Sequence, residues 1–81
     1  MKVFTLKELS EYDGRYGILY VACEGNVYDV TDSPQWRYGY HQSMHRSGMD
    51  LTDEMKRAPH GVELLKTFPL IGVLKSRDKG G

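Results

Sequence analysis

The run GILYVACEGNVYDVT, residues 17–31, constrains the fold of this chain more than any other stretch. Apolar and aromatic residues fill most of positions 18–23 and 27–30, and a turn signal of Glu24, Gly25 and Asn26 separates the two groups. Because successive side chains of a strand point to opposite faces, both strands present apolar residues on both faces. We therefore predict two neighbouring strands in a sheet that other elements cover on at least one side.

Helical patterns lie on either side of this strand pair. Near the N-terminus, Thr5 and Glu8 have the spacing of a capping box, which predicts an opening helix within residues 4–14. After the strands, apolar and aromatic residues follow a helical period over residues 36–48.

The next stretch reads as two short helices with a break between them. Asp50 is a suitable N-cap for a helix over residues 51–58, and Pro59 is expected to end that helix. A second short helix is predicted over residues 62–68, which places His60 in the break.

A closing strand is predicted over residues 70–74. Strands first, then a cluster of short helices and a final strand, are typical of an α+β domain rather than of alternating strand–helix units. The chain of 81 residues is long enough for one domain, which we assign to residues 1–74, followed by a charged, flexible tail over residues 75–81.

Composition excludes several classes of function. Lysine plus arginine and aspartate plus glutamate number 11 each, so no basic field indicates a nucleic acid or a membrane surface as partner. Cys23 is the only cysteine, which excludes a disulfide within one chain. No apolar run is long enough to span a bilayer. We expect a soluble, cytoplasmic and monomeric protein.

Three histidines within twenty residues are the candidates for chemistry: His41, His45 and His60. The first two are four residues apart, so their rings can lie on one side of a helix. Imidazole is a common ligand for zinc, copper and iron, but no spacing typical of a zinc site is present. Partly exposed histidines without a ligand are the alternative, and a metal site of His41, His45 and a carboxylate such as Asp50 is another.

The surroundings of these histidines are rich in large apolar side chains. The set comprises Tyr38, Tyr40, Met44, Met49, Leu51, Met55, Leu64, Leu65 and Phe68. Such residues on short helices form either an ordinary core or a bowl for a flat apolar ligand, and the pattern alone leaves both open. No nucleophile with a neighbouring base and no paired carboxylates indicate catalysis, so we expect a protein that is not an enzyme.

Four segments in this order resemble the cytochrome b5-like haem/steroid-binding domains. FTLKELSEYDG resembles the opening helix of that family, LYVACEGNVYDVT its strand–turn–strand, SGMDLTDEM its AGGDAT step, and LLKTFPLIGVL its closing helix and strand. The resemblance covers the chain up to Leu74 and is that of a small prokaryotic-type member. It implies a small mixed sheet with four to five short helices that form a haem pocket.

The resemblance also implies site residues. Counted from Asp50, the second axial histidine of the family falls on His60, and Met55 falls where the family packs an aromatic residue against haem b. Trp36 stands in place of the family's first axial histidine. The ligand that would accompany His60 is therefore expected from His45 or, with slightly less preference, from His41.

A further alternative is the membrane-associated progesterone receptor branch of the family. In that branch a tyrosine ligates the haem, and Tyr38 and Tyr40 are the nearby tyrosines here, although neither matches the spacing of that branch. The expected pocket residues are Trp36, Tyr38, Tyr40, Met44, Leu51, Met55, Leu64 and Phe68.

The resulting functional hypothesis is a haem-b-binding domain for one-electron transfer or haem-based sensing, with a redox protein as possible partner. The alternative is a non-catalytic module that binds a steroid-like or other flat apolar ligand without haem.

Overall fold

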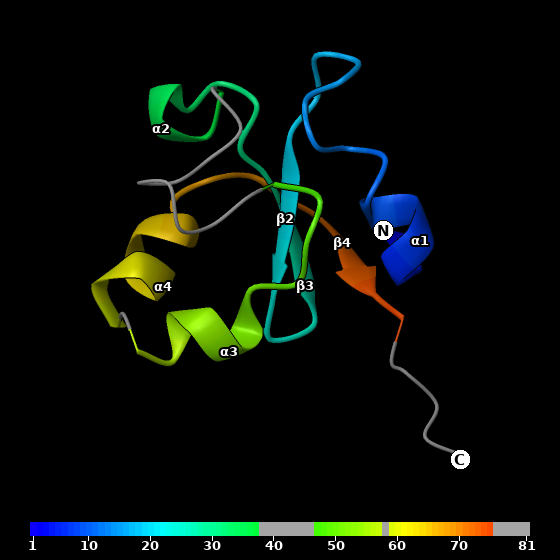
Figure 1. The fold of residues 1–81 in the computed structure, drawn as a ribbon. Helices are drawn as coiled ribbons and strands as arrows, with labels where there is room; N and C mark the ends of the chain where they lie inside the picture. The colour runs from blue at the N-terminus through cyan, green and yellow to red at the C-terminus, as the bar shows by residue number, and fades with distance from the viewer. Residues whose placement is uncertain (38–46, 58, 76–81) are drawn as a thin grey trace.

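A mixed four-stranded sheet forms the centre of the computed structural model, which describes residues 1–37, 47–57 and 59–75 (Figure 1). The strand order is β1 (Lys2–Phe4), β4 (Leu70–Leu74), β3 (Asn26–Asp29) and β2 (Tyr20–Cys23). The first two strands are parallel and the other neighbours are antiparallel. The sheet therefore joins both ends of the described chain, with β2 at one edge.

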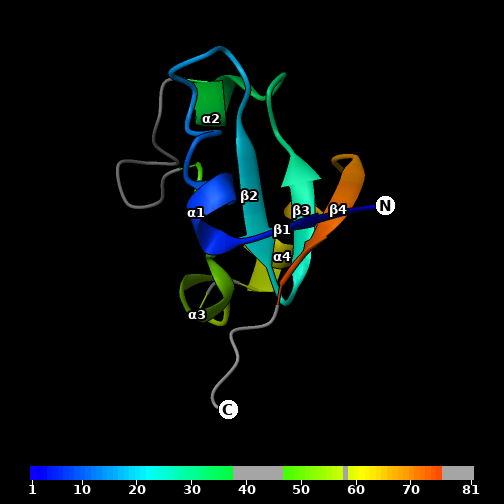
Figure 2. The ribbon, with the colours of Figure 1, turned by 90° about the vertical axis from the view of Figure 1, so that its right-hand side faces the viewer.

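The short helices are divided between the two faces of this sheet. Helix α1 (Leu6–Leu9) lies on one side, whereas α2 (Pro34–Arg37), α3 (Thr52–Met55) and α4 (Pro59–Leu65) lie on the other (Figures 1 and 2). The described residues thus contain four helices and four strands, which confirms the α+β prediction.

The β2–β3 hairpin confirms the predicted strand pair. Its loop has two residues, Glu24 and Gly25, with φ of 52° and 82°. Positive φ at both positions is typical of a type I′ turn, whose twist matches that of the two strands. Asn26, which was predicted as part of the turn, is already the first residue of β3 and pairs with Cys23.

Alternation along the hairpin supplies two separate apolar clusters. On the α1 side, Ala22 and Val27 pack with Phe4 and Leu9, while Tyr12 and Tyr20 stack at 4.5 Å between ring centroids. The second cluster lies on the side of α2, α3 and α4. Both faces of the hairpin are therefore covered, which explains why both carry apolar residues.

The capping box at α1 is confirmed. The Glu8 N–H donates to Thr5 Oγ1, and the Thr5 N–H donates to Glu8 Oε1, each at 3.0 Å. The predicted opening helix was too long, because only Leu6–Leu9 is helical. Strand β1 was not predicted, since three residues carry no period and are recognised only by their pairing with β4.

The prediction that Pro59 ends a helix was wrong. Helix α3 ends earlier, at Met55, and Pro59 begins α4, so the backbone of His60 lies in the first turn of a helix rather than in a break. The physical reason is that the first turn has no intrahelical partner for backbone N–H groups, so a proline fits there at little cost. Leu51 is the N-cap of α3, one residue after the predicted Asp50.

Gly72 lets β1 approach β4 closely. A Cβ atom at this position would collide with the carbonyl oxygen of Lys2 and would lie 2.7 Å from Cε2 of Phe4. The strand therefore needs a residue without a side chain where the ring of Phe4 crosses it.

We predict that Gly72→Ala destabilises the domain by about 1–3 kcal/mol, the usual cost of adding a methyl group where there is no space. Urea unfolding of the two proteins measures the difference. An unchanged midpoint would contradict the close approach of β1 to β4.

Candidate functional site

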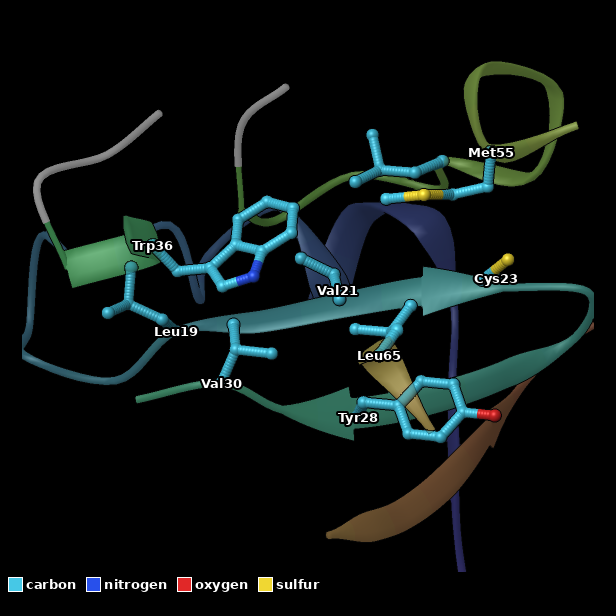
Figure 3. Packing of buried hydrophobic residues seen from close by; sticks show 9 residues of the cluster. Leu19, Val21, Cys23, Tyr28, Val30, Trp36, Met55 and Leu65 are labelled. Carbon is cyan, nitrogen blue, oxygen red and sulfur yellow. The ribbon is translucent and has the colours of Figure 1, made fainter. Parts of the chain in front are cut away.

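The larger apolar cluster lies between the sheet and helices α2, α3 and α4 (Figure 3). Figure 3 shows Trp36 beside Leu19 and Val30 at one end, and Met55 close to Cys23 at the other. The buried members are Leu19, Val21, Cys23, Tyr28, Val30, Trp36, Leu51, Met55 and Leu65. Three helices thus bring side chains from distant parts of the sequence onto one sheet face.

Trp36 is a wall of this cluster. Its side chain is 4% exposed and packs against residues from β2 and from the segment after β3. An indole N–H is only a donor and offers no lone pair to a metal. Tyr28, on β3, is buried in the same cluster.

Helix α3 and its N-cap contribute two of the predicted pocket residues. Leu51 and Met55 are among the most deeply buried side chains of the described chain. Leu51 at the N-cap and Met55 at the end of α3 are four residues apart, so their side chains present a single apolar face to the cluster.

Helix α4 contributes Leu65, which is buried, while its neighbour Leu64 is half exposed. Phe68 packs against the cluster from the segment after the helix, and so does Val62. Sequence reasoning included Leu64 among the pocket residues and left out Val62. The three-residue spacing of Val62 and Leu65 was the signal that identifies the inward face of α4. A role of Leu64 toward a ligand stays a prediction.

Of the three histidines predicted as iron ligands, only His60 has a described backbone. The backbone of His60 lies in the first turn of α4, the helix that packs Leu65 on the cluster. His41 and His45 lie outside the described residues, as do Tyr38, Tyr40 and Met44. Within the described ranges, no three His, Cys, Asp or Glu side chains are grouped to hold a metal ion.

Cys23 behaves as a core residue. Its side chain is buried, and burial raises the pKa of the thiol, with smaller contributions from the carboxylates of Glu24 and Asp50. A thiol with a raised pKa is neither a reactive nucleophile nor a ready metal ligand at neutral pH.

A small cleft of about 310 Å³ lies apart from this cluster, and its lining includes none of the predicted site residues. It is lined by Ser10, Asp13, Arg15, Ser47, Gly48 and Met49. Arg15 Nε and Nη2 donate to the two carboxylate oxygens of Asp13 at 3.1 and 3.0 Å. These hydrogen bonds lower the pKa of Asp13 to about 2, and the two charges offset each other.

Comparison with known proteins decides the family. Residues 5–75 match the family described as cytochrome b5-like haem/steroid binding domain. The chain belongs to this family. The match covers most of the sequence and confirms the resemblance inferred from its four segments. No curated protein matched the chain.

Two solved archaeal structures are similar over nearly the whole chain. The cytochrome b5 domain protein of Hadesarchaea YNP_N21 is 53% identical, with a TM-score of 0.85, over 93% of this chain and 100% of its own. That of Methanococcoides burtonii is 47% identical, with a TM-score of 0.84, over 93% and 99%. Both support the prokaryotic-type assignment.

A more distant structure shows the fold alone. A hypothetical protein of Arabidopsis thaliana, described as having a cytochrome b5 like fold, is 22% identical with a TM-score of 0.73, over 94% of this chain and 93% of its own. The cytochrome b5-like fold predicted from sequence is thereby confirmed. Across residues 1–37, 47–57 and 59–75, none of the helices is long and apolar enough to cross a membrane.

We predict that acid weakens the fold in part through Asp13. Its folded pKa of about 2 lies below the usual 3.8, so the ionised carboxylate stabilises the folded state above pH 4. This contribution falls as the pH drops from 4 through 2. Urea unfolding at pH 5, 3 and 2 is expected to show a steeper loss for the wild type than for Arg15→Gln. Equal slopes would contradict the pairing.

We also predict that the Cys23 thiol is shielded in the native domain. At pH 8 it should react with an aromatic disulfide reagent at least about 100-fold more slowly than in the unfolded chain, because about 10⁻³ or fewer of the molecules are open. A Ser10→Cys, Cys23→Ser variant supplies the rate of an exposed thiol. Comparable rates for the two folded proteins would contradict the burial of Cys23.

Proposed function

We propose that this chain is a haem-b-binding domain that acts in one-electron transfer or in haem-based sensing. His60 is proposed as an axial ligand, and His45 or His41 as the second. The observation that carries the proposal is the sheet face covered by three helices, in a chain of the cytochrome b5-like family.

The residues on this face fit a flat apolar group. Leu51, Met55 and Leu65 are buried and would form the apolar backing of the site, while the partly buried Val62 and Phe68 leave surface open to a ligand. Burial of apolar area against such side chains contributes roughly 25 cal/mol per Å², the main source of affinity for a large macrocycle. The donor type also fits, because imidazole is a regular axial ligand of haem iron.

When bound, haem supplies an iron that takes up and releases one electron. The chain's own residues set the conditions for that exchange. The proposed imidazole of His60 holds the group in place, while the apolar side chains exclude water and keep the surroundings weakly polar. Axial ligands and polarity are the main determinants of reduction potential in such sites.

We propose that the ligand that accompanies His60 does not come from the position used in the usual bis-histidine arrangement. Trp36 stands where the family's first histidine is expected from the sequence spacing, and its side chain is buried among apolar residues. We therefore propose that the ligand comes from further along the chain, from His45 or His41. A tyrosine, Tyr38 or Tyr40, is the alternative that the progesterone receptor branch suggests.

A non-catalytic module for a steroid-like ligand remains the second candidate. The burial of Trp36 at this position favours it, because one family ligand to iron is replaced by a side chain suited to a flat apolar molecule. Under this reading the same apolar face binds its ligand without iron.

Haem titration of the purified domain tests the proposal. The wild type is expected to develop a Soret band, and His60→Ala to weaken haem binding by more than about 100-fold, beyond the effect of partners outside the first coordination shell. Lys66→Ala, an exposed position just after α4, is the matched control and should bind like the wild type.

Two results would contradict this proposal. A wild-type domain that takes up no haem would exclude the haem function, and stabilisation by a sterol would then support the second candidate. A His60→Ala variant with unchanged spectrum and affinity would remove His60 from the ligand set. The same titration of His41→Ala and His45→Ala identifies the second ligand.

A further inference from the structure

We propose that Thr52 is a positioning residue, whose hydroxyl fastens helix α3 to the β2–β3 turn and so fixes the wall formed by Leu51 and Met55. The effect on haem rests on the proposed function. The fastening itself rests on contacts between described residues that lie far apart in the sequence.

The segment before α3 closes the free edge of the sheet. The Gly48 N–H donates to the Tyr20 carbonyl at 2.6 Å, and the Leu51 N–H donates to the Ala22 carbonyl at 2.7 Å. In return, the Ala22 N–H donates to the Met49 carbonyl at 3.0 Å. Residues 48–51 therefore follow β2 closely, and backbone hydrogen bonds fix the chain up to the N-cap of α3.

Thr52 continues this attachment with its side chain. Its Oγ1 accepts a hydrogen bond from the Glu24 N–H at 2.8 Å and donates one to Asp50 Oδ1 at 2.6 Å. The same carboxylate oxygen accepts the Thr52 N–H at 3.1 Å. Because the hydroxyl acts as donor and acceptor at once, an apolar side chain of the same shape cannot replace it.

Glu24, the residue of the β2–β3 turn whose N–H donates to Thr52, has an unusual backbone conformation. Glu24 has a φ of 52°, which is uncommon for a residue other than glycine. The bond from its N–H to Thr52 holds the turn and the helix in one arrangement. Each element thus stabilises the position of the other.

Helix α3 depends on such an attachment because it has only four residues. A helix this short gains too little from its own hydrogen bonds to be stable by itself. Its Met55 N–H donates to the Leu51 carbonyl at 2.9 Å, and the side chains of both residues are fully buried in the cluster. Movement of α3 would therefore move the pocket wall.

Amide hydrogen exchange of the haem-free domain tests the fastening. In Thr52→Val the amides of Glu24 and Met55 are expected to exchange about 3- to 10-fold faster, as for the loss of one hydrogen bond. Thr52→Ser keeps the hydroxyl and should stay within about twofold of the wild type. The Leu9 amide, which bonds to Thr5 on the other sheet face, is the internal reference for global unfolding.

Haem titration of the same variants tests the consequence for the site. We expect Thr52→Val to bind haem about tenfold more weakly, the lower end of the effect of outer-shell partners, and Thr52→Ser to recover the wild-type affinity.

The outcomes separate this inference from the proposed function. If the Glu24 and Met55 amides exchange at the wild-type rate in Thr52→Val, the fastening is overturned. If they exchange faster but haem affinity is unchanged, the role of Thr52 at the site is overturned. Neither result affects the proposed function. Equal acceleration of the Leu9 amide shows general destabilisation and also overturns the fastening. A wild type that binds no haem overturns the proposed function and, with it, the expected effect of Thr52 on haem affinity. The amide exchange rates still test whether Thr52 fastens α3 to the turn.

Discussion

The structure depends on one constraint, the two-faced β2–β3 hairpin. A type I′ turn at Glu24 and Gly25 fixes its register, and with it the face to which every side chain of the two strands points. One set packs under α1 and the other under α2, α3 and α4. A shift of one residue would exchange the two sets, so both clusters rely on the same turn.

The hairpin also determines where the helices stand. Strand β2 is an edge of the sheet, and an edge presents unpaired backbone groups. Here residues 48–51 satisfy these groups and deliver the chain to the start of α3. The segment that covers the edge of the sheet therefore also supports one wall of the candidate site. The helices are short, and contacts with the sheet rather than helical propensity hold them in place.

The family resemblance predicts an axial histidine at the position that Trp36 occupies. A large aromatic side chain fills the sheet face next to Leu19 and Val30, at the position from which an axial histidine is expected (Figure 3). Under the proposed function, the apolar face on this side is continuous with the core, and the iron ligand must come from another part of the chain. His60, on a helix whose Leu65 reaches the cluster, is the one predicted histidine with a described backbone.

The sequence by itself determined the hairpin, the capping box at Thr5 and Glu8, the closing strand and the family. The hairpin, the capping box and the strand follow from local rules: apolar runs bounded by turn residues, and reciprocal bonds between residues three apart. The family follows from the order of four segments along the chain. Leu51 was expected in the pocket from its residue type and Met55 also from the family resemblance, and both side chains are buried.

Only the tertiary structure decided the rest. Strand β1 exists because β4 pairs with it. The bond between Thr52 and Glu24 joins residues 28 apart. Such features depend on contacts between distant segments, and local sequence patterns carry no information about those.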